Sequence, residues 1–365
     1  MVERNMVVLN LASPLPGLDR YFRLKIKVKG EVVEDCKPEV GFSHKGLEKT
    51  AESMIPIQMP FLASKIDSSS GISGEVAYSI ALESALSLKV PERANAIRVV
   101  LMEISRIASH LGWLSNFSLA VGFVTCYHYA QRDKERALRF IEILTGSRIS
   151  PNFCVPGGIK GDIKSSVIFE FLDFLTYLDG RMREFDLLLT DNKFFRGKVD
   201  NIGRIQREHA LTFGLTGPNL RACGERMDIR KIVPYCGYEN LNFKVPVGRR
   251  GDCFDRYQVR MKEIRESSDI LKGILSNMPD GDVYVKPLID VRSRKVEEYA
   301  RVECPHGELG IFIKYDLKEV PTRFKVRTPS LVSVSLLRDA IINQRVSDVG
   351  VIVSSFDICL SEVDR

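Results

Sequence analysis

The sequence predicts an α+β fold with a central bundle of long helices, an N-terminal β-hairpin element and a small C-terminal α/β section. Two observations support this prediction. Apolar residues recur at helical spacing over most of residues 46–275, whereas residues 21–40 alternate between apolar and polar, and the segments beyond 283 are short and strand-like. We expect one compact body with three parts: a β element at 1–43, a helical core at 44–282, and an α/β section at 283–365 packed on the core.

The first predicted element is a β-hairpin. Phe22, Leu24, Ile26 and Val28 are separated by single polar residues, so they share one face of a strand. The tripeptide at 29–31 contains a glycine and marks the turn. We expect the return strand to end near residue 40.

The clearest helix follows Pro91, a residue that suits the first helical turn. One apolar stripe recurs there at steps of three and four residues, and most of the other faces are apolar as well, which predicts burial all round. The stripe consists of Val100, Ile104, Ile107, Leu111 and Leu114.

Charged residues lie along one side of this helix. Glu103, Arg106 and His110 are three and four residues apart, so they are neighbours on the helix surface. Buried charges must be paired. Two interpretations stay open: an internal salt-bridge network, or a proton-conducting or redox-coupled role.

The remaining elements are predicted from the same periodicities. Further helices are expected at 74–88, 124–145, 164–190 and 255–276, and short strands at 299–303, 310–314 and 323–327. A helix at 331–343 and a last buried strand at 349–354 complete the predicted chain.

Composition is that of a folded protein, with 44% hydrophobic and 27% charged residues. No apolar run approaches the roughly 18–20 residues that a membrane span requires. The N-terminus has no basic segment followed by an apolar run, as a secretory signal would. We therefore expect cytosolic exposure, with docking on a membrane protein still open.

The eight cysteines include no Cys-x-x-Cys pair, so we expect free buried thiols and no iron–sulfur cluster held by this chain alone. The net charge of +6 is spread along the chain. Its densest basic segments lack the interleaved aromatics and motifs of nucleic-acid binding. They are interpreted as solvated surface or as contacts to an anionic partner, and no nucleic-acid partner is expected.

Five blocks and the last residues of the chain resemble one superfamily, the nickel–iron hydrogenase large subunits and the related D (49 kDa) subunit of NADH:quinone oxidoreductase, respiratory complex I. The blocks are G-F-S-H-K-G-L-E-K at 41–49, V-P-E-R-A at 90–94, G-P-N-L-R-A-C-G at 217–224, G-D-C-F-D-R-Y at 251–257 and E-C-P-H-G-E-L-G at 303–310. The ending is C-L-S-E-V-D-R at 359–365. The resemblance implies structural roles for Lys45, Glu48, Arg221, Asp228, Arg230, Arg256, Asp364 and Arg365.

The hydrogenases of this superfamily hold their metals with two Cys-x-x-Cys clamps. The corresponding positions here are Ser70 and Ser73 near the N-terminus, and Cys359 and Glu362 at the C-terminus. A nickel–iron centre needs four soft thiolates, and at most one remains. We therefore expect no metal bound by this chain, and the resemblance points to the complex I side.

For complex I the resemblance implies a wall of the quinone cavity, beside an iron–sulfur cluster on a B-type partner subunit. Quinone is then the substrate, NADH is oxidised by other subunits, and electron transfer to quinone is coupled to proton translocation. The implied partners are B-, C-, H- and I-type subunits and the membrane arm. The implied location is peripheral, on the cytoplasmic side of the inner (plasma) membrane.

The carry-over of quinone-binding residues is incomplete. The family's N-terminal histidine block has no counterpart in residues 10–17, and Ser68, after Asp67, occupies the position of the family's tyrosine donor. The remaining candidates near the quinone cavity are His44, Asp67 and Ser68, and none is assigned as catalytic. An isolated histidine is more often a structural hydrogen-bonding residue than a proton donor, so both interpretations of His44 stay open, with the structural one favoured. His306 stands where arginine is commoner in the family and is interpreted as an interface or salt-bridge residue.

Two alternatives remain beside a working complex I subunit. The chain could be a non-catalytic scaffold paralogue in a membrane oxidoreductase, because the family's proton donors are substituted. It could also be a hydrogenase large subunit without its metal site, an interpretation that the missing thiolates disfavour.

Overall fold

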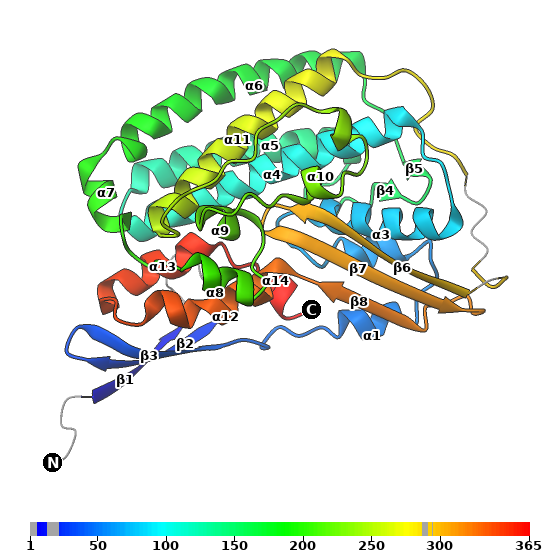
Figure 1. The fold of residues 1–365 in the computed structure, drawn as a ribbon. Coiled ribbons are helices and arrows are strands. Elements are labelled where there is room, and N and C mark those ends of the chain that lie inside the picture. Colours follow the sequence, from blue (N-terminus) through cyan, green and yellow to red (C-terminus); the bar gives the residue numbers. More distant parts are fainter. Residues whose placement is uncertain (1–5, 13–21, 287–290, 294) are drawn as a thin grey trace.

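The computed structural model describes residues 6–12, 22–286, 291–293 and 295–365. Its centre is the predicted bundle of long helices, and this confirms the α+β fold class (Figure 1). The bundle contains α3 (Gly71–Leu86), α4 (Glu92–Val121), α5 (Val124–Thr145), α6 (Ser165–Phe185) and α11 (Cys253–Ser276). The division at residues 43 and 282 stays a prediction.

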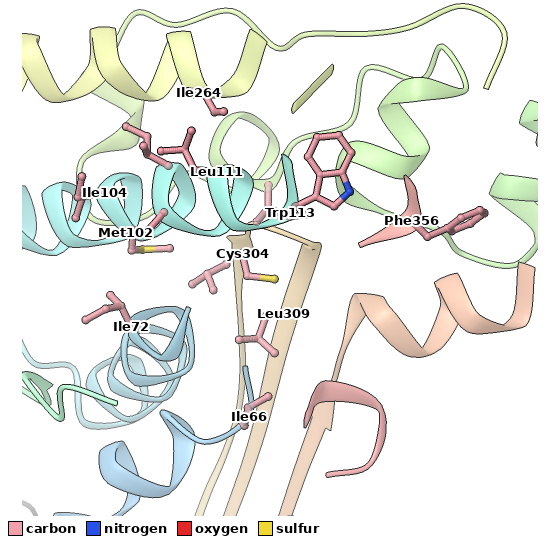
Figure 2. Close-up of a cluster of buried hydrophobic side chains, with 14 of the residues drawn as sticks. Ile66, Ile72, Met102, Ile104, Leu111, Trp113, Ile264, Cys304, Leu309 and Phe356 are labelled. Atoms are coloured by element: carbon pink, nitrogen blue, oxygen red, sulfur yellow. The ribbon is translucent and has the colours of Figure 1, made fainter. Parts of the chain in front are cut away.

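Helix α4 is the middle of the hydrophobic core. It contacts α3, α5, α11 and α13 (Val349–Phe356), so apolar side chains on all its faces are buried. Figure 2 shows Ile104 and Leu111 of α4 below Ile264 of α11, with Ile72 of α3 and Cys304 on the opposite side. Burial all round explains why this helix has so many apolar faces in the sequence.

The N-terminal hairpin is confirmed. Strands β2 (Arg23–Lys29) and β3 (Val32–Glu39) pair antiparallel, and β2 alternates exposed and buried residues. A strand that the sequence did not predict, β1 (Met6–Ala12), pairs antiparallel along the whole of β2. The first residue of the predicted hairpin, at 21, lies outside the described residues, as does the segment 13–20.

The C-terminal sheet is antiparallel, in the order β6 (Lys295–Cys304), β7 (Gly307–Asp316), β8 (Arg323–Arg327). Helix α3 packs against β6 and β7. The β6–β7 turn brings Cys304 and His306 toward the bundle, where Gly307 (φ +140°) lies against the loop at Thr216. A Cβ at this glycine would meet the Thr216 hydroxyl oxygen at 2.7 Å. The backbone approach therefore needs glycine on two grounds.

The predicted strand at 349–354 is wrong. These residues belong to α13, which packs against α4, α11 and α12 (Pro329–Ile341). A short apolar run rich in valine is compatible with either a buried strand or a buried helix, and periodicity alone does not separate them. Here the segment packs against helices on several sides and is itself helical. Asp357 therefore lies at the C-terminal end of α13.

Short elements connect these parts. The predicted helix at 164–190 ends as an α-helix at Phe185 and continues as a π-helical turn, η1 (Asp186–Thr190). Among the described helices, none combines the length and the apolar character needed to cross a membrane. The remaining elements are α1 (Leu47–Ala51), α2 (Met59–Ala63), β4 (Cys154–Val155), β5 (Gly158–Ile159), α7 (Lys193–Val199), α8 (Arg207–Thr212), α9 (Gly217–Ala222), α10 (Ile229–Ile232), η2 (Tyr238–Asn240), η3 (Val346–Asp348) and α14 (Leu360–Val363).

Close packing of α3 gives a first test. A Cβ at Gly74 would lie 2.1 Å from the carbonyl oxygen of Ala63, a backbone atom that can move only with α2. Gly74→Ala should lower the free energy of unfolding by about 1–3 kcal/mol. The matched control is Gly180→Ala in α6, where a Cβ would meet no atom within 4 Å. That variant should gain about 0.5–1 kcal/mol. Urea unfolding of both variants measures the difference, and equal effects would contradict the close α2–α3 contact.

Candidate functional site

The charged side of α4 lies in a buried ion network. Both oxygens of Glu103 accept from Arg230 (3.1 and 3.3 Å), one accepts from Arg106 (3.3 Å), and Tyr238 and Ser267 each donate a bond of 2.5 Å. Burial raises the pKa of Glu103, but the two arginines outweigh burial and hold it below its ordinary value. The carboxylate is therefore ionised and fully paired.

A second part of the network joins α9 and α10 to the bundle and to β6. Arg221 donates to Glu263 (2.9 Å) and to Glu303 (2.7 Å), and Asp228 pairs with Arg230 at 2.7 Å. His110 lies 2.9 Å from the other oxygen of Glu263. The structure therefore places the charged stripe of α4 in a salt-bridge network.

Two arginines of α11 hold the C-terminal helix α13. Arg256 donates to the Ser355 hydroxyl of α13 (2.9 Å) and to the carbonyls of Gly251 and Gly203 (2.8 Å each), so these partners are neutral groups. Arg260 donates to the carbonyl of Phe356 (3.0 Å) and lies 3.7 Å from Asp357. These contacts fix the end of α13 where it meets the core.

The last residues of the chain tie down the loop before α1. Asp364 accepts from the backbone N–H groups of Gly41 (2.7 Å) and Ser43 (2.9 Å). Arg365 lies 3.4 Å from Glu48, which also pairs with the Lys325 ammonium at 2.5 Å. Lys45 is exposed on the same loop.

His44 lies apart from the other two candidates for the quinone cavity. Its imidazole lines a shallow hollow with Glu48 and Arg365. Asp67 and Ser68 instead belong to the loop between α2 and α3. Among the described residues, no side-chain hydrogen bond joins His44 to Asp67 or Ser68. The structure brings together two of the three residues.

The Asp67–Ser68 loop lies against the C-terminal segment. The Ser68 N–H donates to the Ser361 hydroxyl (2.9 Å), and the Ser68 hydroxyl lies 3.6 Å from Cys359 Sγ. Asp67 Oδ1 accepts from the N–H and the hydroxyl of Ser69, each at 2.8 Å. The loop before α3 therefore meets the C-terminal segment here, as the two metal clamps of the hydrogenase resemblance would.

The side chains at the two clamp positions differ from the four cysteines that the hydrogenases carry there. Ser70 and Ser73 share a hydrogen bond of 2.8 Å with each other. Glu362 is buried, and its Oε2 accepts from the N–H of Ser330 at 3.2 Å. Burial, together with Asp67 and Glu362, raises the pKa of Cys359 to about 12. Cys359 is therefore a thiol, and the described clamp holds no set of thiolates for nickel and iron.

A buried histidine lies between three carboxylates beside this clamp. His306 Nδ1 lies 3.4 Å from Asp67 and 3.3 Å from Glu362, and its Nε2 lies 3.5 Å from Asp357. Burial lowers the pKa of His306, but the three carboxylates outweigh it and raise the pKa well above its ordinary value. The imidazolium and the Arg260 guanidinium, 3.7 Å from Asp357, are thus the positive charges that face these carboxylates.

Four donor groups of the cluster have the residue types of a metal site. One ligand atom each from Asp67, Cys304, His306 and Glu362 lies within 4.8 Å of the others, and all four residues are buried. Imidazole, carboxylate and thiolate together suit zinc-class ions better than calcium or magnesium, which prefer oxygen ligands. These residues could therefore hold a metal even though the hydrogenase clamps are lost.

A cavity of about 240 Å³ opens next to the cluster. Ser68 and Asp357 line one part of it, and Trp113, Lys134 and Leu138 line another. The Lys134 ammonium lies near Gly112, since a Cβ at this glycine would be 3.5 Å from Nζ. Within the described chain, no carboxylate lies within salt-bridge distance of Lys134. Arg148, paired with Glu135 and Glu142, also lines the cavity, which thus combines hydroxyl groups, two cations, the Asp357 carboxylate and apolar walls.

A sequence profile described as "Respiratory-chain NADH dehydrogenase, 49 Kd subunit" matches residues 120–292 and 288–365. The chain is also 34% identical over 365 residues to a protein from Bacillus mycoides (strain KBAB4) that is named as the D-type subunit of NADH-quinone oxidoreductase, with 100% of both chains covered. This chain belongs to the 49 kDa subunit family of the respiratory-chain NADH dehydrogenases.

Two further relatives of this 49 kDa family chain extend the comparison. A protein from Synechococcus sp. (strain JA-2-3B'a(2-13)), named as the H-type subunit of NAD(P)H-quinone oxidoreductase, is 34% identical over 384 residues, with 98% of each chain covered. A solved chain matches with a TM-score of 0.94 and 30% identity over 100% of both chains. It comes from the "Structure of the membrane-bound sulfane sulfur reductase (MBS), an archaeal respiratory membrane complex". The resemblance to the 49 kDa family is confirmed.

Sequence reasoning missed Cys304, Asp357 and Lys134 as residues of this site. Cys304 lies in a block that the motif comparison had found. His306 of the same block was interpreted as an interface or salt-bridge residue, and its contacts to three carboxylates agree with the salt-bridge interpretation. Asp357 was hidden by the wrong strand prediction, which left the end of α13 unplaced. Lys134 carried no signal, because only the α4–α5 contact places it at the cavity.

The buried ion network around Arg221 should contribute to the stability of the fold. Arg221→Ala leaves Glu263 and Glu303 buried without their guanidinium, which should cost about 3–5 kcal/mol in the free energy of unfolding. The control is Arg207→Ala, which removes an exposed pair with Glu225 and should cost at most about 1 kcal/mol. Chemical unfolding measures both, and comparable losses would show that the network is not needed for stability.

The same network predicts an acid dependence. Burial raises the pKa of Asp228, but Arg230 and Arg221 outweigh it and lower the pKa from 3.8 to about 2. A carboxyl whose pKa is lower in the folded state contributes its full stability above pH 3.8 and loses it as pH falls toward 2. In urea titrations, Asp228→Asn should be less stable at neutral pH and should lose less stability across that range. An unchanged slope would contradict the assignment.

Proposed function

We propose that the chain is the D-type subunit of an NADH-quinone oxidoreductase-type membrane complex and lines the site where quinone is reduced. Family membership supports the assembly, and the cavity beside Ser68 supports the site. In this proposal an iron–sulfur cluster on a B-type neighbour delivers the electrons. NADH is oxidised elsewhere in the complex, and quinone reduction is coupled to proton translocation.

The observation that carries the proposal is the composition of the cavity. Trp113 and Leu138 offer apolar surface to a flat ring, and Ser68 and Ser109 offer hydroxyl groups to ring oxygens. The volume of about 240 Å³ suits a head group better than a whole lipid-soluble molecule. A quinone tail would therefore lie outside the described cavity, toward partner subunits.

Quinone reduction adds two electrons and two protons, and negative charge develops on the ring oxygens between these steps. A cation beside the ring stabilises that charge, and Lys134 is the cavity residue that carries one without a described carboxylate partner. Ser68 stands at the position of the family's tyrosine donor, but a hydroxyl of serine is a weaker acid than a phenol. In this proposal Ser68 orients the head group, and protons arrive through water.

The surface around the cavity supports contact with other subunits. Ile149 lines the cavity and is 70% exposed, so the cavity opens beside an apolar side chain that a partner subunit could cover. B-, C-, H- and I-type subunits and the membrane arm are the proposed partners, on the cytoplasmic side of the inner (plasma) membrane.

A turnover assay of the assembled complex tests the site. Lys134→Met should lower quinone-dependent turnover by about 10²-fold, the cost of removing one electrostatic donor, while Lys134→Arg should retain most of it. Ser68→Tyr should raise turnover by about 10²-fold if a phenol restores a general acid. The exposed Lys164→Met variant controls for loss of surface charge.

Three outcomes separate this proposal from its rivals. A scaffold gives no quinone turnover in any variant while the complex still assembles. Wild-type turnover that is unchanged in Lys134→Met, Ser68→Tyr and Asp67→Asn would contradict the placement of the head group. Because His44 lies in a separate hollow, an effect of His44→Ala that exceeds that of Lys134→Met would move the site to the surface near Arg365.

A second candidate acceptor follows from a specific observation. The solved chain that matches over 100% of both sequences belongs to a complex described as a sulfane sulfur reductase, and the family's tyrosine donor is a serine here. Sulfane sulfur can be reduced without a phenolic donor, so the same cavity would hold a short polysulfide. Turnover with polysulfide and none with quinone would favour this acceptor.

A further inference from the structure

We propose that Asp67, Cys304, His306 and Glu362 bind one divalent cation of the zinc class through their carboxylate, thiolate and imidazole groups. This inference is independent of the acceptor proposed above. It departs from the expectation that the chain binds no metal, which rested on the missing thiolates of the hydrogenase clamps. The proposed ligand set uses Glu362 but neither Ser70 nor Ser73.

The distances between ligand atoms fit a four-coordinate ion. Zinc is bound at about 2.0–2.3 Å by these groups, so neighbouring ligand atoms of a tetrahedron lie roughly 3.3–3.7 Å apart. His306 Nδ1 lies 3.3 Å from Glu362 Oε1 and 3.4 Å from Asp67 Oδ2, and Cys304 Sγ lies 3.7 Å from Glu362 Oε1. With all four atoms within 4.8 Å of one another, a small inward movement would complete the coordination.

Two ligand atoms are without a hydrogen-bond partner in the described part of the chain. They are Asp67 Oδ2 and His306 Nδ1, both in residues that are at least nine-tenths buried. The two atoms face each other at 3.4 Å, within ion-pair distance but without a hydrogen bond, and a shared cation would bind both.

The remaining polar atoms of the ligands are held by neighbours. Asp67 Oδ1 accepts from Ser69, and Glu362 Oε2 accepts from the N–H of Ser330. His306 Nε2 lies 3.5 Å from Asp357, so Nδ1 is left for the ion. A carboxylate behind a ligating imidazole is the usual second layer of a zinc site.

The exchange balances in charge. One divalent ion enters, and the proton on the His306 imidazolium and the proton on the Cys304 thiol leave. The net charge of the cluster is therefore unchanged, and Arg260, at 3.7 Å from Asp357, remains its nearby cation. Neither oxidant nor reductant is required.

The test uses the purified full chain, stripped with a chelator and dialysed against Zn²⁺ or Co²⁺. We expect about one metal ion per chain by elemental analysis. Bound Co²⁺ should give visible bands of a tetrahedral site and a thiolate-to-cobalt charge-transfer band in the near ultraviolet. A wild-type chain that retains no stoichiometric Zn²⁺ or Co²⁺ would overturn the proposal.

Matched variants locate the site. His306→Arg keeps a positive charge among the carboxylates but cannot ligate, so the fold should persist while metal affinity falls at least about 10²-fold. Cys304→Ser should abolish the charge-transfer band. Cys126→Ser, another buried cysteine, lies outside the cluster and should change neither measurement. Circular dichroism and thermal unfolding check the fold of each variant. If His306→Arg binds the ions as tightly as the wild type, the cluster is an ion-pair group and the metal site is elsewhere or absent.

Discussion

The fold depends on the pairing of charges that are completely removed from water. Glu103, Arg221 and Arg230 are buried at the junction of α4, α9, α10 and β6, where each meets at least one opposite charge. An isolated charge in such a place would cost several kcal/mol, whereas a complete network is close to neutral and fixes the relative positions of its elements. The cluster of Asp67, Cys304, His306 and Glu362 is connected to this network. Arg106 bonds the carbonyls of Glu303 and Cys304, and so connects the two.

Much of the fold could be predicted because its long helices carry strong local signals. The predicted bounds of α5 and β8 match the structure residue for residue, since each is bordered by glycine, proline or a polar turn. Helix α13 was missed because its eight residues contain too few turns to set a period. Strand β1 was missed because its only described partner is an exposed edge of β2, and pairing of that kind leaves little trace in the sequence.

The candidate site was predictable only in part, because it is assembled from distant segments. Asp67 and Ser68 were found through family motifs, and Cys359 and Glu362 through the lost clamp. His306 enters only when the β6–β7 turn closes on the α2–α3 loop, a contact between segments far apart in the chain. A histidine in place of an arginine changes the chemistry available there, because an imidazole can lose its proton or bind a metal and a guanidinium cannot.

The anchoring of the 41–43 loop by Asp364 has a consequence for the order of folding. A residue 323 positions from Gly41 supplies the acceptor for two backbone N–H groups near the start of the chain. On the ribosome the early loop must wait until nearly the whole polypeptide has been made. Contacts of such sequence separation slow folding, because loop closure costs entropy before any contact is gained. The N-terminal sheet and the bundle can form earlier, so their docking through this segment is expected to be a late step in folding.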